Sequence, residues 1–259
     1  MEGPFLSLEK RGSQLESAIQ PLSVQTLADL MDGFEDSVRL MTLAPEGAHG
    51  VEMVKWLRAR HIFVSLGHSM ASFQESEEAF LAGANRVAHL YNGMRIFDHR
   101  EPGIVGATLT NENVFAELTL DGIHVHPAAA KLALKAKGLD MIILVTDAMQ
   151  AAGLPDGIYL RPGNRKTIVK DGAARVENGS LAGSVLTLDK AVRYAIQTLG
   201  VKAPDAFKMA GYNVALSLNL EYQMGSLRPG LPADLILLDD KYMVQETYLN
   251  GFRLGIEEK

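Results

Sequence analysis

The chain has 259 residues, 47% of them hydrophobic, so it can bury a sizeable core in one large domain. Its net charge of −6 and its pI near 5.7 argue against a general nucleic-acid-binding protein, and the absence of cysteine excludes disulfides and thiolate metal ligands. No apolar run reaches the length of a membrane span, and the N-terminus lacks the pattern of a signal peptide. We therefore expect a cytoplasmic protein without nucleic-acid or membrane partners.

Short apolar runs alternate with helical stretches over the first 147 residues. We expect helices at 26–33, 50–60, 72–83 and 127–137, and strands at 38–43, 61–66, 86–88, 114–120 and 141–145. A loop at 92–106 is long for a connection between a strand and a helix, and this length favours a functional role. The alternation predicts an α/β protein with a parallel sheet or barrel.

The pattern changes after Asp147. Residues 151–180 are rich in Gly, Pro, Asn and Asp and contain short β-like pieces. Amphipathic helices are predicted at 184–199 and 204–218, and short strands of a small β unit at 224–227, 233–238 and 244–249. We therefore expect two domains, at residues 1–220 and 221–259.

A polar residue follows several of the predicted strands. His68 and His89 lie 21 residues apart, about one strand and one helix, so adjacent parallel strands would bring both imidazoles to the same edge. Either histidine alone is more simply a satisfied buried residue, but two at matching strand ends, joined by a carboxylate, favour a catalytic metal site. Asp147 follows five apolar residues and fits a general base and acid, or else a helix N-cap.

The roles of five further residues remain open on spacing alone. Glu2 and Glu46 both lie in proline-containing turns, and the pattern does not decide which of them would bind a metal. Arg100 in the long loop is either a solvated charge or a clamp for a phosphate or carboxylate. Asn92-Gly93 offers backbone N–H groups for the same anion.

A series of motifs, in order, resembles the N-acetylglucosamine-6-phosphate deacetylase family of the amidohydrolase superfamily over essentially the whole chain. The motifs are Glu-Gly-Pro-Phe-Leu at 2–6, Thr-Leu-Ala-Pro-Glu at 42–46, Gly-His-Ser at 67–69, His-Leu-Tyr-Asn-Gly-Met at 89–94, Arg-Glu-Pro-Gly at 100–103, Asp-Gly-Ile-His-Val at 121–125, Val-Thr-Asp-Ala at 145–148, Leu-Ala-Gly-Ser at 181–184, and the segment from Gly225-Ser226-Leu227 to Ala233-Asp234-Leu235. The resemblance implies a TIM-barrel-like (β/α) metal-dependent hydrolase fold, incomplete at the N-terminus, with a small C-terminal β-sandwich remnant.

The resemblance also assigns roles residue by residue. It implies that Glu2, His68 and His89 hold one divalent metal ion and that Asp147 accepts and donates the proton. It implies contacts to the substrate from Ser13, Gln14, Asn92, Gly93, Arg100, Asp121, Gly122, Ile123, His124, Leu181, Ala182 and Gly183. Arg100 would reach the substrate of a neighbouring subunit, which implies a homodimer.

The implied reaction is deacetylation of N-acetylglucosamine 6-phosphate to glucosamine 6-phosphate and acetate, in amino-sugar catabolism. Two other readings stay open: an amidohydrolase for another cyclic amide or an aminopurine, and a catalytically impaired remnant that only binds sugar phosphate. The metal would be zinc, with iron or manganese as alternatives, since all three accept two imidazoles and a carboxylate.

Two departures from the family pattern bear on activity. Gln14 stands where the family has a histidine, and an amide donates a hydrogen bond but carries no charge. Family members also have more than a hundred residues before the point that corresponds to Glu2, so only five barrel strands are expected here, with the strand leading into Glu2 absent. Five strands leave two exposed edges. The hypothesis is therefore a truncated chain of marginal stability, which a cooperative melt of the isolated chain would refute.

Overall fold

A five-stranded parallel sheet forms the centre of the molecule. The computed structural model describes residues 1–162 and 164–255. The strands of the sheet follow chain order, and each pairs in parallel with the next: β1 (Leu40–Leu43), β2 (Phe63–Leu66), β3 (Arg86–Val87), β4 (Phe115–Leu118) and β5 (Ile142–Leu144). Nearly every residue of these strands is buried, as expected for a parallel sheet covered by helices.

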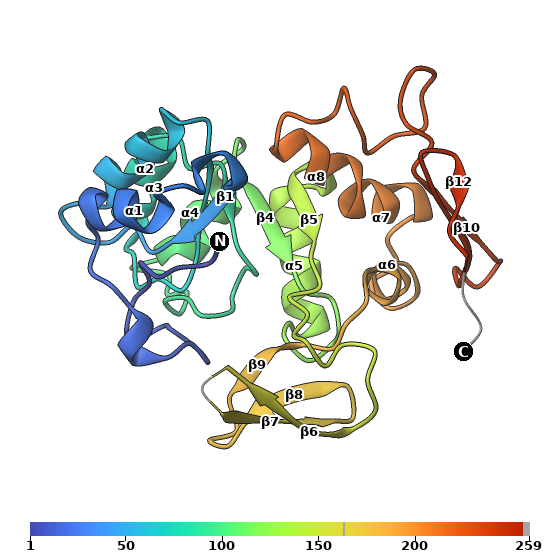
Figure 1. The fold of residues 1–259 in the computed structure, drawn as a ribbon, viewed down its shortest axis with the longest axis horizontal. Helices are drawn as coiled ribbons and strands as arrows, with labels where there is room; N and C mark the ends of the chain where they lie inside the picture. Colours follow the sequence, from blue (N-terminus) through green and yellow to red (C-terminus); the bar gives the residue numbers. More distant parts are fainter. Residues whose placement is uncertain (163, 256–259) are drawn as a thin grey trace.

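Helices connect the strands and cover the sheet (Figure 1). They are η1 (Glu16–Ala18), α1 (Val24–Met31), η2 (Glu35–Ser37), α2 (Gly50–Arg58), α3 (Phe73–Leu81), α4 (Gly103–Thr110), α5 (Pro127–Lys137) and η3 (Leu139–Met141). Local sequence explains several boundaries. Ser72 and Glu75 form a capping box at the start of α3, and α5 begins at Pro127 and ends before Gly138, whose φ is +77°.

The expectation of a loop over 92–106 is wrong at its end, because α4 begins at Gly103. Glu101 accepts hydrogen bonds from the backbone N–H groups of Phe73 (2.8 Å) and Gly103 (3.1 Å). One carboxylate therefore joins the starts of α3 and α4. The first turn of α4 is buried, and burial holds the glycine-containing segment in a helix.

A second, antiparallel sheet lies below the first in Figure 1. It consists of β6 (Gly157–Arg161), β7 (Arg165–Lys170), β8 (Ala173–Val176) and β9 (Leu181–Ser184), in that order. Each strand pairs with the next through a short turn, and Asn164 and Asp171 adopt the left-handed conformation that such turns need. The predicted short β-like pieces thus form a complete sheet of their own.

The last third of the chain holds three helices and a small sheet: α6 (Leu188–Gln197), α7 (Ala203–Ala210), α8 (Tyr212–Ser217), β10 (Leu235–Leu238), β11 (Val244–Leu249) and β12 (Phe252–Arg253). The single helix predicted at 204–218 is two helices, which break at Gly211. The strand predicted at 224–227 is wrong, because these residues form a bend. The division into residues 1–220 and 221–259 stays a prediction, and residues 256–259 lie outside the described part.

The main hydrophobic core joins the parallel sheet to α1–α7, and a smaller cluster around Ala151, Val169 and Ala174 lies under the β6–β9 sheet. Within the described residues no helix is long and apolar enough to cross a membrane.

The first residues of the chain lie along the free edge of β1. Glu2 forms a parallel bridge with Thr42, the Met1 amine donates to the Leu40 carbonyl (2.8 Å), and the Gly3 N–H donates to the Thr42 carbonyl (3.0 Å). The expectation of five parallel strands, without a further strand that leads into Glu2, is confirmed among the described residues, and Glu2 itself forms only an isolated bridge. This pairing places Glu2 near the carboxyl end of the sheet, where β2 and β3 also end.

Candidate active site

Three of the residues predicted for the site lie two or three positions after the end of a parallel strand. His68 follows β2, His89 follows β3 and Asp147 follows β5, and all three have left-handed backbones, with φ of 48°, 30° and 49°. A non-glycine residue in this region is uncommon and costs free energy, and such residues cluster at functional sites. The left-handed turn ends each strand and directs the chain across the carboxyl edge of the sheet, where α/β barrels carry their chemistry.

Glu2, His68 and His89 converge on one point. The Nε2 atom of His68 lies 3.2 Å from Glu2 Oε1, and Nε2 of His89 lies 3.6 Å from Glu2 Oε2. One ligand atom from each residue lies within 4.8 Å of the others. Ligand atoms at about 2.1 Å from one ion lie roughly 3.4 Å apart when the angle at the ion is tetrahedral. The spacing of these donors therefore fits a single divalent cation.

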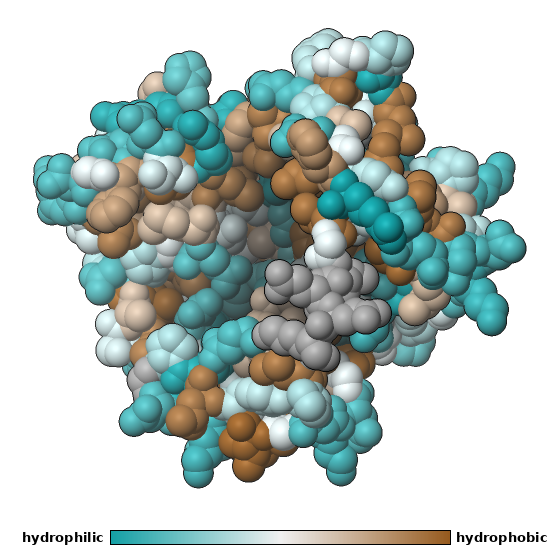
Figure 2. All heavy atoms as spheres, turned by 45° about the vertical axis from the view of Figure 1, so that its right-hand side comes forward, coloured by the Kyte–Doolittle hydropathy of each residue, from teal (hydrophilic) through white to brown (hydrophobic). Residues whose placement is uncertain are grey.

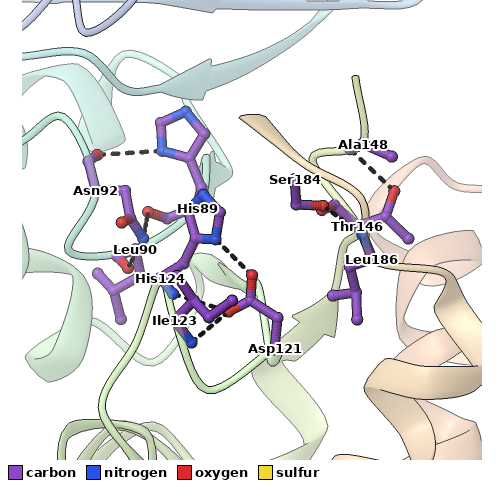
Figure 3. Close-up of polar contacts among 10 residues, drawn as sticks. All are labelled: His89, Leu90, Asn92, Asp121, Ile123, His124, Thr146, Ala148, Ser184 and Leu186. Atoms are coloured by element: carbon purple, nitrogen blue, oxygen red, sulfur yellow. Dashed lines mark hydrogen bonds and ion pairs between the residues drawn. The ribbon is translucent and has the colours of Figure 1, made fainter. Parts of the chain in front are cut away.

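Hydrogen bonds on the other ring nitrogens fix both imidazoles. Nδ1 of His68 lies 2.6 Å from the Lys10 carbonyl, and Nδ1 of His89 lies 3.1 Å from the Asn92 carbonyl, the latter visible in Figure 3. A carbonyl only accepts, so Nδ1 must carry the proton and Nε2 keeps its lone pair. Metal-binding histidines in proteins are oriented in this way.

The negative charge of Glu2 between the two imidazoles favours a bound cation. Burial opposes ionisation of Glu2, but hydrogen bonds and charge from His68 and His89 outweigh it and hold the pKa of the carboxyl well below its usual range. Burial likewise lowers the pKa of His89, but the hydrogen bond and charge of Glu2 overcome it, and the net pKa is raised. The carboxylate thus stays ionised and attracts positive charge to the point where the two imidazoles meet.

The structure also separates Glu2 from Glu46, which the sequence pattern left undecided. Glu46 accepts from Ser69 Oγ at 2.6 Å and from the Met70 N–H at 2.8 Å. It therefore holds the segment after His68, and it is absent from the group of three that could bind an ion among the described residues.

Asp147 faces the same cavity as the metal group. Burial raises the pKa of its carboxyl and the Glu2 charge adds to this, while His89 acts in the opposite direction. Its backbone is held by the Ser184 N–H, which donates to the Asp147 carbonyl at 2.7 Å. A Cβ atom on Gly183 would lie 2.9 Å from that same carbonyl, so the close approach of β9 requires glycine.

A cavity of about 540 Å³ joins these groups. It lies between the end of the parallel sheet and the β6–β9 sheet, where the surface is hollowed in Figure 2. Of the residues predicted for the site, it is lined by Glu2, Ser13, Gln14, His68, His89, Asn92, Gly93, His124, Asp147, Leu181, Ala182 and Gly183. The sequence prediction and the cavity therefore agree for most of the residues.

Asp121, Gly122 and Ile123 do not line this cavity. The Asp121 carboxylate lies 2.6 Å from His124 Nδ1 and also accepts the N–H groups of Ile123 and His124, each at 2.8 Å (Figure 3). Both side chains of the pair are nearly buried, at 7% and 4% exposure. Asp121 therefore orients His124, while Asp121 and Ile123 border a separate, smaller cavity next to Tyr194.

Arg100 lies apart from the cavity, in an exposed loop. Ile96 and Phe97 lie in the same loop shortly before Arg100, and their side chains are 81% and 54% exposed. Arg100 is thus not brought to the site of its own chain.

Gln14 and Gly93 lie directly against the metal group. Gln14 Nε2 donates to Glu2 Oε1 at 2.9 Å, so this amide contacts the predicted metal ligand. Gly93 has φ of +60°, and a Cβ there would lie 2.8 Å from His68 Nδ1. Only glycine allows the loop after His89 to pass so close to His68.

A buried ion pair between Arg86 and Glu117 lies next to the backbone of His89. Arg86 Nη1 lies 3.2 Å from Glu117 Oε1, and Arg86 also donates to Ser217 of α8. Glu117 accepts the N–H of His89 through its carboxylate at 3.4 Å and the N–H of Leu90 through its carbonyl at 2.7 Å. Burial raises the pKa of Glu117, and the Arg86 charge opposes the rise.

Sequence reasoning missed six residues that line the cavity: Gly12, Ala148, Met149, Gln150, Arg161 and Ser180. Five of them adjoin predicted residues in sequence and could have been found by proximity. Arg161 lies twenty residues before Leu181 in a segment that read only as short β pieces, and no motif marked it.

Comparison with known proteins supports the resemblance read from the motifs. A model of the Amidohydrolase family matches residues 1–253. An N-acetylglucosamine-6-phosphate deacetylase of Lysinibacillus sphaericus is 40% identical over 253 residues, and an N-acetylgalactosamine-6-phosphate deacetylase of Escherichia coli O157:H7 is 38% identical over 251 residues. Each match covers 97% of this chain but only 64% and 66% of the relative, so the chain spans just under two thirds of their length.

Solved structures agree with the fold as well. The N-acetylglucosamine-6-phosphate deacetylase of Thermotoga maritima superimposes with a TM-score of 0.90 at 37% identity, over 97% of this chain and 68% of that one. A mutant of the Mycobacterium smegmatis enzyme in complex with N-acetyl-D-glucosamine-6-phosphate gives 0.91 at 32% identity, over 97% and 67%. These likenesses confirm the predicted α/β fold of the TIM-barrel-like hydrolases. The chain therefore belongs to the amidohydrolase family, and within it to the family of the N-acetylglucosamine-6-phosphate deacetylases.

Proposed function

We propose that this chain carries the catalytic centre for metal-dependent deacetylation of N-acetylglucosamine 6-phosphate, which yields glucosamine 6-phosphate and acetate. The observation that carries the proposal is the convergence of Glu2, His68 and His89 at one end of a cavity that Asp147 also lines. A carboxylate and two imidazoles with the remaining side open to a cavity are a common catalytic metal set.

Glu2, His68 and His89 would hold one divalent ion, zinc in the first place, with iron or manganese as alternatives. When bound, such an ion acidifies water and polarises the carbonyl of an amide. The donors contain no sulfur, because the chain has no cysteine, and they do not by themselves select among the three metals.

Asp147 would move the proton. Its carboxylate first accepts a proton from the attacking water and then donates it to the nitrogen of the leaving amine. The raised pKa of Asp147, caused mainly by burial, suits a group that must hold this proton between the two steps.

Gln14 would orient the site rather than supply charge. Its amide already donates to Glu2 at 2.9 Å. A neutral donor stabilises a developing oxyanion less than a cationic imidazole, so we expect slower turnover than with histidine at this position.

The substrate's phosphate would be bound by Asn92, Gly93 and His124 from the same chain and by Arg100 from a second copy. Arg100 is exposed and does not line the cavity of its own chain, while Ile96 and Phe97 near it expose apolar surface. Exposed apolar side chains that adjoin a functional residue fit a protein interface. We therefore propose a homodimer, with the cytoplasm as its expected location.

The sugar ring and its acetyl group would occupy a pocket lined by Leu181, Ala182 and Gly183.

The test is acetate release by the purified, metal-loaded chain. We expect turnover of N-acetylglucosamine 6-phosphate and little turnover of unphosphorylated N-acetylglucosamine. N-acetylgalactosamine 6-phosphate belongs in the same assay, because one relative at 38% identity is named for that sugar, which differs at a single carbon. Preference for the galactose form would change the proposed substrate but keep the reaction.

A second candidate function is binding without catalysis, which the Gln14 contact to Glu2 favours. Calorimetry with glucosamine 6-phosphate separates the two. Binding together with acetate release supports the deacetylase, and binding without acetate release supports a sugar-phosphate-binding remnant. Absence of both, in a folded and metal-loaded chain, would overturn the proposed function.

A further inference from the structure

Arg161, at the end of β6, has a side-chain nitrogen that forms no hydrogen bond with the described residues. Its side chain lines the cavity that also holds Glu2, His68 and Asp147. Its Nη1 atom is buried, and it has no hydrogen-bond partner among residues 1–162 and 164–255. A buried guanidinium nitrogen without a partner is costly, so its side chain suits a group that enters the cavity.

The neighbourhood of Arg161 is cationic. Arg165 lies close enough that, after burial, its charge lowers the pKa of Arg161 further. Neither arginine forms an ion pair with a carboxylate in the described part of the chain. Two guanidinium groups side by side without a counter-charge make a place where an anion is favoured.

The backbone around Arg161 is tied to the site on both sides. Arg165 Nη1 donates to the Ser13 carbonyl at 2.6 Å, across 152 residues of sequence. Gln150 Nε2 donates to the Leu160 carbonyl at 2.6 Å. The end of β6 and the start of β7 are therefore held against Gln150 and Ser13, and Arg161 keeps its place at the cavity wall.

We propose that Arg161 binds the phosphoryl group of the substrate from within the same chain and so serves as a specificity-determining residue. The inference rests on the proposed function for the identity of the substrate. A guanidinium offers two parallel N–H donors that match a phosphate monoester, and a phosphate ester has the charge that the Arg161–Arg165 pair lacks. Among the described residues that line the cavity, Arg161 is the one arginine or lysine, so it supplies a cationic side chain from the same chain in addition to Arg100 of the second copy.

Steady-state kinetics on the metal-loaded full chain tests the inference. In Arg161→Ala we expect KM for N-acetylglucosamine 6-phosphate to rise roughly 10- to 100-fold, with kcat changed by less than about threefold, because a charge-assisted contact is lost far from the reacting bond. The kcat/KM for unphosphorylated N-acetylglucosamine should stay the same. Arg161→Lys should recover part of the loss, since it keeps the charge but not the paired donors.

Lys166→Ala is the matched control, since Lys166 lies on the same hairpin, is exposed and carries the same charge. It should leave both substrates unaffected. Equal losses for the phosphorylated and unphosphorylated sugars in Arg161→Ala, or losses of the same size in Lys166→Ala, would overturn the assignment.

Calorimetry keeps this inference separate from the proposed function. Glucosamine 6-phosphate should bind the wild type more tightly than glucosamine does, and Arg161→Ala should remove most of that difference. If the wild type releases no acetate but shows this pattern, the deacetylase proposal fails and the Arg161 assignment stands. An unchanged difference in Arg161→Ala refutes the assignment, whatever the outcome of the acetate assay.

Discussion

Glu2 and Glu46 show that the surroundings of a carboxylate decide whether it suits a metal ion or holds a loop in place. Both lie close to a proline in the sequence, but Glu2 contacts two imidazoles, while Glu46 accepts hydrogen bonds from Ser69 and Met70. A carboxylate whose oxygens accept from a hydroxyl and a backbone N–H fixes a loop, and one that faces two Nε2 atoms suits a cation. The sequence contained both glutamates but not this difference.

Asp147 gives the sharpest residue-scale prediction. Asp147→Asn keeps the size and shape of the side chain but removes its ability to accept a proton, so we expect turnover to fall by about 10²- to 10⁴-fold. Binding of glucosamine 6-phosphate should persist, which calorimetry can verify. Asp36→Asn, at an exposed position in η2, is the control and should retain full turnover. Retention of more than a third of the activity in Asp147→Asn would exclude Asp147 as the proton carrier.

Lys137 predicts a pH dependence of stability. It is only 9% exposed, donates to the Asn111 carbonyl, and burial lowers its pKa to about 8 from an ordinary 10.5, although Glu112 opposes the shift. Between pH 8 and 10.5 the unfolded chain binds this proton and the folded chain does not, so stability rises with pH through that range. The stability of the wild type relative to Lys137→Met should therefore increase from pH 8 to pH 10.

Thermal melts of both proteins at several pH values measure this difference. Lys135→Met on the exposed side of α5 is the control, and its difference from the wild type should not vary with pH in the same range. A flat difference for Lys137→Met would mean that Lys137 titrates normally in the folded protein.

At the scale of elements, the start of α3 connects helix capping to the site. Ser72 accepts the N–H of Glu75, and the Glu75 carboxylate accepts the N–H of Ser72 at 2.9 Å, only four residues after His68. Loss of an N-cap hydroxyl costs about 1 kcal/mol of stability. Ser72→Ala should thus lower the free energy of unfolding by about this amount in urea denaturation.

Ser37→Ala provides the comparison for Ser72→Ala. Ser37 is exposed at the end of η2 and makes no side-chain hydrogen bond among the described residues, so its removal should change the free energy of unfolding by less than about 0.5 kcal/mol. Equal effects of the two substitutions would show that the capping box contributes little in this protein.

Elements were predictable where local sequence marks both ends. The helix Pro127–Lys137 has the predicted bounds because proline starts it and Gly138 ends it. The start of α4 at Gly103 was missed because its stability comes from burial and from Glu101, a partner shared with α3. The break at Gly211 was missed because the amphipathic pattern runs through it from 204 to 218.

At the scale of the whole molecule, a metal bound at Glu2, His68 and His89 would link distant parts of the chain. A ligand that binds only the folded state stabilises it by about 2.7 kcal/mol when its concentration is a hundred times the Kd. We therefore expect zinc to raise the melting temperature of the wild type and a chelator to reverse the rise. His68→Ala should abolish most of the effect.

His61→Ala is the control for this measurement. His61 is exposed and lies just before β2, the strand that precedes His68. It belongs to no group that could bind a metal among the described residues. The zinc-dependent rise should be unchanged in this variant. A rise of equal size in His68→Ala would mean that the ion binds elsewhere.

The sequence by itself determined the class of fold, the family and most of the residues that line the cavity, although not Arg161. It could do so because short apolar runs mark the strands, and because the side chains predicted for the site lie within three residues of the strand ends, as His68, His89 and Asp147 do. Only the tertiary structure decided which groups meet. Glu2 rather than Glu46 joins the imidazoles because Met1 to Gly3 pair with β1. Arg161 reaches the cavity because Arg165 fixes its hairpin to Ser13 across 152 residues, and contacts between segments so far apart depend on packing, which no local pattern encodes.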